Sequence, residues 1–517
     1  MRRPSSRKTL PAHLLVLTLV AVALAGCGTT VQLGPAGAAG GAPTSEFGVP
    51  TPAVTSPSGS GSQGAGGPGG TPGLSAIGTN PAGEPGSGAK PTSAPSTSLS
   101  AHGATGATGH GVTDSTVEIG VAVSSDEGSF ISSFGLKGLT PDGDTNVQMQ
   151  AIVNDINRHG GLAGRKIVLV KHDYPAAQTI SDPSTANQAA CATWTQDHHV
   201  FAVVGPPLVN DTLLQCLAKA DTPLIYNGGG LEYPLHYQGT YDRFPTFFNV
   251  GSMLGDRYDA IAIRRLYQRG FFSPWNTVRG APGLGATQMR LGIVAYDDND
   301  GAIQLASETR QLARYGIKPT EIVKCPRDIA GKVPCEQGAV LRFNSNRVTN
   351  VFNADTTFMS TANNQGYHPR YFVEVEPGIF SQNVSKGVLR GAMGEDYVPA
   401  LDVAPRGHPA DPSPATTHCK NVMKAVHQPT TMGVTVWNEE VMCDGFYFLA
   451  AAVKANPVLN TEGLVAGFNS LRDFPSALTW KSELSPTNHA SAMALRDLSY
   501  GTACNCWTYD NTKNQTE

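Results

Sequence analysis

The 517 residues carry 37 basic and 41 acidic side chains, a formal net charge of −4 at pH 7, and charged residues make up 15% of the sequence. No basic stripe accompanies this near balance, so the sequence predicts no nucleic-acid partner. Beyond an N-terminal stretch of low complexity, about 400 residues remain, which are enough for two domains with a substantial core.

The N-terminus has the organisation of a secretory signal. Basic residues between positions 2 and 8 precede an apolar run, Leu14 to Ala25, that is too short to span a bilayer as a mature helix. The run ends in Leu24-Ala25-Gly26-Cys27, which resembles the lipobox of bacterial lipoproteins. We expect residues 1–26 to be a cleaved signal peptide and an acylated (palmitate-type) Cys27 to anchor the protein to the outer face of the cell membrane. A plain signal peptide with an incidental cysteine is the alternative.

Residues 28–111 are mostly Gly, Ser, Pro, Ala and Thr, with only Glu46, Glu84 and Lys90 charged. Such a segment cannot bury enough apolar surface to offset its ordering entropy. A fixed three-residue glycine period, which a collagen-like repeat needs, is not found in it. We therefore predict that 27–111 is the lipidated cysteine followed by a disordered tether.

Short strands then alternate with helices. Val117, Ile119, Val121 and Val123 alternate as in a strand, and apolar residues spaced by three and four from Met149 predict a helix. Further strands are predicted at 167–170, 201–204 and 223–226, each after a helical segment. This order favours parallel pairing with right-handed crossovers, hence a doubly wound α/β sheet. In such sheets the ligand crevice lies beyond the carboxyl ends of the strands.

The second half repeats this plan. Strands are predicted at 291–296 and 348–352, and helices at 302–315 and 357–365. The apolar stretch from Asp444 to Val453 predicts a long helix, which we expect on the C-terminal lobe.

Eight cysteines remain once Cys27 is set aside, and an even number in an exported chain predicts disulfides. Sequence order favours Cys191 with Cys216 and Cys325 with Cys335. The other four pair either as Cys419 with Cys443 and Cys504 with Cys506, or across. No CxxC motif occurs, so we predict neither a metal site nor another cofactor.

Three blocks resemble one family: 112–120 (VTDSTVEIG), 154–166 (NDINRHGGLAGRK) and 200–205 (VFAVVG). It is the type I periplasmic solute-binding proteins of the leucine/isoleucine/valine-binding group, the branched-chain amino-acid receptors of ABC importers. The resemblance extends over about 112–509. It implies an α/β fold of two doubly wound parallel-sheet lobes joined by a hinge, the Venus-flytrap arrangement.

In this family the chain crosses three times between the lobes. We therefore expect lobe 1 at 112–247 with a return segment near 382–427. Lobe 2 and the C-terminal crossover are expected at 248–381 and 428–517.

The resemblance also implies which loops face a ligand. The expected contacts from the first lobe are Ser124, Ser125, Pro207, Asn210, Gly229 and Gly230, and those from the second are Asp300, Asp355, Thr356 and Glu376. This chain lacks hydroxyl donors for an α-carboxylate at Leu208, Val209 and Leu231, and it has aspartates where the family has aromatic side chains. Acidic groups favour a cation or a ligand with many hydroxyls.

The sequence thus predicts a noncatalytic, lipid-anchored solute-binding protein that captures a small polar ligand, amino-acid-like or other, for the permease of an ABC importer. The alternative is a cell-envelope sensor or interaction lipoprotein on the same bilobal scaffold, because a fold does not dictate a function. An enzyme is not predicted, since no GxSxG, HExxH or P-loop motif occurs.

Acylation of Cys27 predicts membrane retention. The native chain should enter the detergent phase on Triton X-114 partitioning, and Cys27→Ser should stay in the aqueous phase, because each buried methylene contributes about 0.8 kcal/mol of membrane affinity. Equal partitioning of the two proteins would contradict the lipid anchor.

Overall fold

The computed structural model describes residues 109–126, 143–207, 209–227, 236–374, 383–398, 413–430, 437–511 and 513–517. The predicted signal peptide, Cys27 and nearly all of the tether lie outside these ranges. So do three of the expected site residues, Gly229, Gly230 and Glu376.

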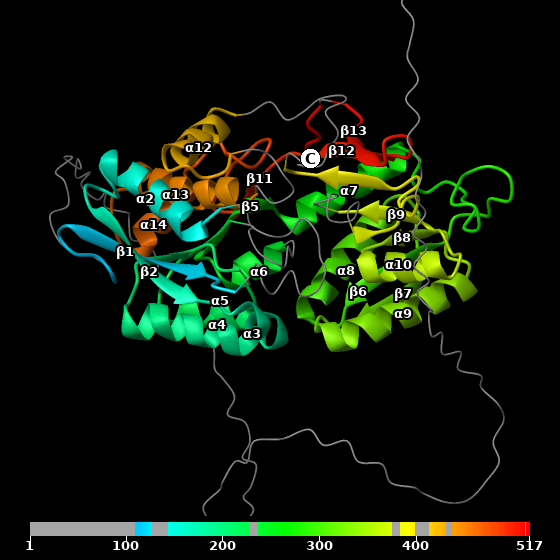
Figure 1. The fold of residues 1–517 in the computed structure, drawn as a ribbon, viewed down its shortest axis with the longest axis horizontal. Helices are drawn as coiled ribbons and strands as arrows, with labels where there is room; N and C mark the ends of the chain where they lie inside the picture. Colours follow the sequence, from blue (N-terminus) through cyan, green and yellow to red (C-terminus); the bar gives the residue numbers. More distant parts are fainter. Residues whose placement is uncertain are drawn as a thin grey trace, which may run out of the picture. The chain divides into compact units, whose positions relative to one another are not determined.

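Two sheets organise the described part of the chain (Figure 1). The sheet of lobe 1 has the order β11-β5-β4-β3-β1-β2, and all of its pairings are parallel. Its strands are β1 (Thr116–Val123), β2 (Lys166–Asp173), β3 (Ala202–Val204), β4 (Leu224–Tyr226), β5 (Phe247–Met253) and β11 (Ala490–Ala492).

The sheet of lobe 2 has the order β13-β12-β10-β9-β8-β6-β7. It is parallel from β7 to β10, and β12 and β13 join antiparallel. Its strands are β6 (Leu291–Tyr296), β7 (Pro319–Cys325), β8 (Asn350–Phe352), β9 (Arg370–Val373), β10 (Met393–Asp396), β12 (Arg496–Gly501) and β13 (Cys506–Tyr509).

Helices cover both faces of each sheet, as Figure 1 shows. In lobe 1, one face packs on α2 (Thr145–Arg158), α12 (Pro414–Ala425), α13 (Trp437–Ala455) and α14 (Thr461–Phe468). The other face packs on α4 (Pro183–Ala192), a π-helical turn (Thr193–Asp197), α5 (Asp211–Lys219) and α6 (Gln238–Arg243), with α3 (Ala176–Ser181) before α4. In lobe 2, α7 (Gly255–Gln268) and α8 (Asn299–Ala313) lie on one face and α9 (Ile329–Ser345) and α10 (Thr356–Asn364) on the other. The predicted doubly wound α/β class is confirmed.

The block at 154–166 has a clear physical basis. It ends α2 and turns the chain into β2, which pairs with β1. Gly161 has φ +64°, and a Cβ there would lie 2.0 Å from the carbonyl oxygen of Arg165. Only glycine tolerates this approach together with this backbone conformation.

The expected division into lobes is wrong in its C-terminal part. The described elements change lobe three times, between β5 and α7, between β10 and α12, and between β11 and β12. However, the long helix α13 packs on lobe 1, where Phe446 and Leu449 share a core with Ile119 and Ile152. Helices α12, α13 and α14 and strand β11 therefore belong to lobe 1, and β10 within the expected return segment belongs to lobe 2. A helix that is apolar on most of its surface does not indicate which sheet it covers.

Four disulfides fasten helices and a hairpin. Cys191 pairs with Cys216 and Cys325 with Cys335, as sequence order predicts. Of the two arrangements left open, the structure has Cys419 with Cys443 and Cys504 with Cys506. The Cys419–Cys443 bond joins α12 to α13, and thus reinforces the segment that returns to lobe 1.

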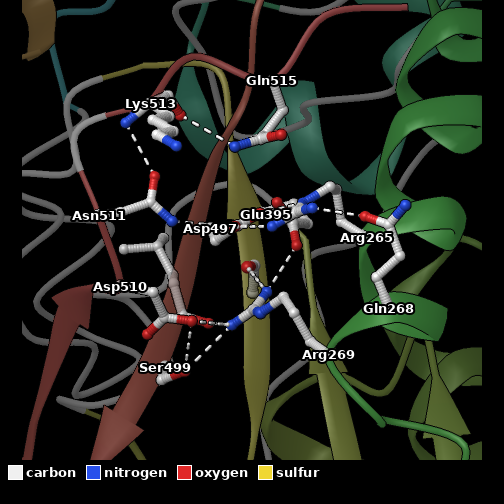
Figure 2. Close-up of polar contacts among 12 residues, drawn as sticks. Arg265, Gln268, Arg269, Glu395, Asp497, Ser499, Asp510, Asn511, Lys513 and Gln515 are labelled. Carbon is white, nitrogen blue, oxygen red and sulfur yellow. Dashed lines mark hydrogen bonds and ion pairs between the residues drawn. The ribbon is translucent and has the colours of Figure 1, made fainter.

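Buried charges hold the third crossing in place (Figure 2). Arg265 of α7 and Arg269, its C-cap residue, project toward β10 and β12. Arg265 forms a bidentate pair with Asp497, with N–O distances of 3.0 and 2.6 Å. Arg269 pairs with Glu395, whose side chain is 0% exposed, and with Asp510 after β13. Burial raises the pKa of Glu395, and Arg269 opposes that rise.

Removal of one partner of this network should be costly. Arg269→Met leaves the buried Glu395 carboxylate without its cation and should lower the free energy of unfolding by about 3–5 kcal/mol. Arg342→Met, in which the 59% exposed Arg342 loses Glu321, should cost about 1 kcal/mol or less. Urea denaturation of both variants measures the difference. The double variant Arg269→Met/Glu395→Gln should recover much of the loss, and equal losses in the two single variants would contradict the assignment.

Candidate functional site

The loops after β1 and β2 are tied together in lobe 1. Ser125 donates from its backbone nitrogen and its hydroxyl to the two carboxylate oxygens of Asp173, at 3.0 and 2.9 Å. The Ser124 hydroxyl contacts Asp126, which also accepts a hydrogen bond from the backbone nitrogen of Ala176. The predicted wall residues thus meet at the carboxyl ends of neighbouring parallel strands, and the hydroxyl of Ser125 already has a partner.

Asn210 has a structural role as a helix cap. Its side-chain oxygen accepts from the backbone nitrogen of Leu213, at the start of α5, and from the amide of Asn187 at 2.8 Å. Asn187 in turn accepts from the buried hydroxyl of Tyr174. Pro207, half-buried after β3, is the other described candidate in this loop.

In lobe 2 the predicted Asp355 also caps a helix. Its carboxylate accepts from the backbone nitrogens of Thr357 and Phe358 at the start of α10, and it pairs with Lys332 at 3.0 Å. Thr356 is the half-buried first residue of the same helix. Asp355 is therefore not a free acidic group, because its charge is already balanced.

Three further side chains at this edge were not predicted from the sequence. Tyr296 ends β6, and the guanidinium of Arg327 lies 4.0 Å from the centroid of its ring. The hydroxyl of Tyr296 lies 3.3 Å from the ammonium of Lys332. Arg327 also pairs with Asp298, which caps α8. The carboxyl end of the lobe 2 sheet thus presents an aromatic hydroxyl and two cations as well as carboxylates.

The Cys325–Cys335 bond determines where these cations lie. Cys325 ends β7 and Cys335 lies in the first turns of α9, so the bond holds the start of α9 against the sheet edge. Arg327 and Lys332 both fall inside the ten-residue loop that it closes. The predicted disulfide was thus the sequence signal that could have indicated Arg327 and Lys332 as site residues. A side chain inside so short a closed loop can reach only a small region of space.

Charges of the two lobes act on each other here. Asp300 lies half-buried in the first turn of α8, and burial raises the pKa of its carboxyl. Asp211 and Arg243 form an ion pair in lobe 1, and their charges act on Asp300: Asp211 raises its pKa and Arg243 lowers it. Arg327 acts in the same way on the buried His236 of lobe 1: burial is the larger cause, and together they lower its imidazole pKa to about 4. The Asp300 environment therefore includes groups from both lobes.

Three carboxyls form a second group, which we call the acidic cluster: Asp259 of α7, Glu308 of α8 and Glu374 after β9. Glu308 accepts from the amides of Gln304 and Asn353, both at 2.9 Å, while its other oxygen has no partner among the described residues. Burial raises the pKa of Glu308 to about 7 and, together with Glu308, that of Glu374 to about 8. Burial is also the largest cause that raises the pKa of Asp259, so all three carboxyls of the cluster have a raised pKa.

Within the described ranges, no group of His, Cys, Asp and Glu is arranged to hold a metal ion. No helix in the same part of the chain is both long enough and apolar enough to cross a membrane.

Comparisons with known proteins give matches in structure alone. No protein-family model and no curated protein matches the sequence. A solute-binding protein of an ABC transporter from R. palustris, solved with 4-hydroxybenzoate, has a TM-score of 0.55 at 11% identity, over 78% of this chain and 97% of its own. A branched-chain amino-acid ABC transporter protein from Thermus thermophilus with bound valine has 0.52 at 11%, over 78% and 97%.

A third match is a fatty acid ABC transporter substrate-binding protein from Thermomonospora curvata, with a TM-score of 0.53 at 13% identity over 79% of this chain and 94% of its own. Identities this low establish the fold alone. The chain has the fold of type I periplasmic binding proteins, and the resemblance found in the sequence is confirmed at that level.

The acidic cluster makes stability depend on pH. The pKa of Glu308 is raised in the folded protein, so its stabilising protonated form is complete below about pH 4.5 and is lost as the pH rises through about 7. Deprotonation of Glu308 between pH 5 and pH 8 should lower the free energy of unfolding by about 2–3 kcal/mol.

Glu308→Gln imitates the protonated side chain and should flatten this decline in urea denaturation at the two pH values. Glu462→Gln, on the exposed first turn of α14, is the control and should keep the native slope. A Glu308→Gln variant with the same slope as the native chain would reject the assignment.

Proposed function

We propose that this protein is an extracytoplasmic, lipid-anchored solute-binding protein that captures a small polar ligand between its two lobes for an ABC importer. The described residues support a ligand site at the carboxyl ends of both parallel sheets, the usual place for ligands in open α/β folds. The structurally similar proteins are solute-binding proteins, which favours the same role here. The acylated Cys27 and the tether would keep the binding lobes close to a permease.

The observation that carries the proposal is the group formed by Tyr296, Lys332 and Asp355. At the sheet edge the Lys332 ammonium lies 3.3 Å from the hydroxyl of Tyr296 and 3.0 Å from the carboxylate of Asp355, so it links groups from three chain segments. A polar ligand can exchange hydrogen bonds with each member.

Ligand chemistry follows from the balance of these groups. Each of Asp298 and Asp355 is paired with a cation, so the edge offers donors and acceptors in similar number. This revises the sequence-based expectation of an acid-lined site that prefers cations. A ligand that carries both signs of charge, or a carboxylate together with hydroxyls, fits better than a simple cation.

The proteins of similar fold are described with 4-hydroxybenzoate, with valine and as a fatty acid binder. All three ligands carry a carboxylate. A carboxylate reaching Lys332 would gain a charge-assisted hydrogen bond and replace part of what Asp355 supplies. Glu376 and the backbone at Gly229 and Gly230 remain candidates for the rest of the site.

The test begins with native mass spectrometry of protein purified without refolding, to identify a co-purified ligand. Calorimetry with that ligand should then show a loss of roughly ten- to a hundredfold in affinity for Lys332→Met, since a charge-assisted hydrogen bond contributes about 1.5–3 kcal/mol. Lys318→Met, at an exposed position before β7, should bind as the native chain does.

Two further measurements test the site independently. Tyr296→Phe removes only the hydroxyl and should weaken binding without altering the unfolding midpoint. Small-angle scattering should show compaction on addition of the ligand, because contacts from both lobes favour closure. Native affinity in Lys332→Met and Tyr296→Phe would reject the site. A persistent failure to find a small ligand would favour the envelope sensor.

A further inference from the structure

The hairpin of β12 and β13 carries an unusual disulfide at its tip. Cys504 and Cys506 are bonded across a single residue, Asn505. The other three disulfides span 25, 10 and 24 residues. In the chain-entropy model a bond that closes so short a loop constrains the unfolded chain least of the four.

Access distinguishes this bond further. Cys504 is exposed and Cys506 is half-buried. In each of the other pairs at least one cysteine is fully buried: Cys191, Cys325, and both Cys419 and Cys443. Thiol–disulfide exchange requires a thiolate to reach a sulfur, so only the hairpin bond offers an unburied sulfur on both sides.

The backbone at the bond favours opening. Asn505 has φ +55°, in the left-handed region that non-glycine residues adopt with some strain. Asparagine tolerates this region better than most residues, so the ring can form. Once the bond breaks, Asn505 is free to leave this conformation.

The hairpin does not depend on the bond for its structure. Four residue pairs connect β12 and β13, from Leu498–Tyr509 to Gly501–Cys506. Trp507, directly after Cys506, is fully buried and packs edge-on against Tyr500 with ring centroids 5.4 Å apart. Reduction can therefore be local, with the strands and the tryptophan in place.

We propose that Cys504–Cys506 is a thiol–disulfide exchange site for a protein dithiol of the CxxC class. A thiolate of the dithiol attacks the exposed Cys504 sulfur, the S–S bond breaks, and the sulfur of Cys506 leaves as a thiolate that takes up a proton. The second thiol of the partner, losing its proton, then attacks the mixed disulfide. It releases Cys504 as a thiol and leaves the partner oxidised. Two electrons pass from partner to chain, and the buried disulfides stay intact.

The first experiment measures selectivity on the full chain in native buffer. The chain is titrated with dithiothreitol, blocked with iodoacetamide and mapped by peptide mass spectrometry. We expect Cys504 and Cys506 to be alkylated at roughly tenfold lower dithiothreitol than the other disulfide cysteines. Alkylation of Cys325 and Cys335 at the same or lower concentration overturns the proposal.

A second readout shows whether reduction is local. The emission of the chain's five tryptophans, to which the buried Trp507 contributes, should not shift to the red, and the unfolding midpoint should not change, when only this bond is reduced. A red shift of the emission together with loss of the midpoint overturns the proposal, because the bond would then be structural.

The third experiment tests exchange with a protein dithiol. The probe is thioredoxin whose resolving cysteine is replaced by serine, so that the mixed disulfide persists. The native chain should form an adduct that maps to Cys504, and Cys504→Ser/Cys506→Ser should form none. The matched variant Asn505→Gly, which keeps both sulfurs and relaxes the backbone, should react more slowly. An adduct in the double serine variant, or none in the native chain, overturns the proposal.

Discussion

The second lobe depends on the compensation of carboxylates that its folding buries. Glu395 and Asp497 lie on adjacent antiparallel strands, almost without solvent, and their cations come from Arg265 of α7 and from Arg269, its C-cap residue. Because an isolated buried charge costs several kcal/mol, β10 and β12 can pair only where Arg265 and Arg269 meet them. The same helix begins directly after the first crossing. One set of charges therefore couples the first crossing to the third.

Helix caps explain why some expected ligand residues have other roles. Of the expected ligand residues, Asp355 and Asn210 follow a strand and accept hydrogen bonds from the first backbone nitrogens of the next helix, as does Asp298, which was not predicted to bind ligand. In an open α/β fold the ligand crevice and the helix N-termini lie at the same edge. A polar residue after a strand therefore satisfies both patterns, and the sequence cannot separate them. The two roles are distinguished by the groups that contact the carboxylate in the structure, such as Lys332 beside Asp355.

Much of the fold could be predicted from the sequence because its signals are local. The alternation in β1 and the glycines at 160–161 depend on neighbours within a few residues, and they place the elements correctly. The lobe of α13 could not be predicted, since it depends on contacts with α2 more than 280 residues away. Arg327 and Lys332 were missed for the same reason: their partner Tyr296 ends another strand, β6, and Asp355, the partner of Lys332, follows β8.

The disulfide between Cys325 and Cys335 connects a local sequence signal with long-range contacts. Its cysteines are ten residues apart, so the pairing is a local signal, yet its effect is to hold Lys332 beside groups from β6 and from the start of α10. A lysine side chain loses considerable rotamer entropy when it is fixed in one position. Because the disulfide holds the start of α9, folding carries part of this entropy cost, and ligand binding carries less of it. A site organised before the ligand arrives can use the contacts for affinity. A site that orders its cations only on binding would not need a covalent bond at this position.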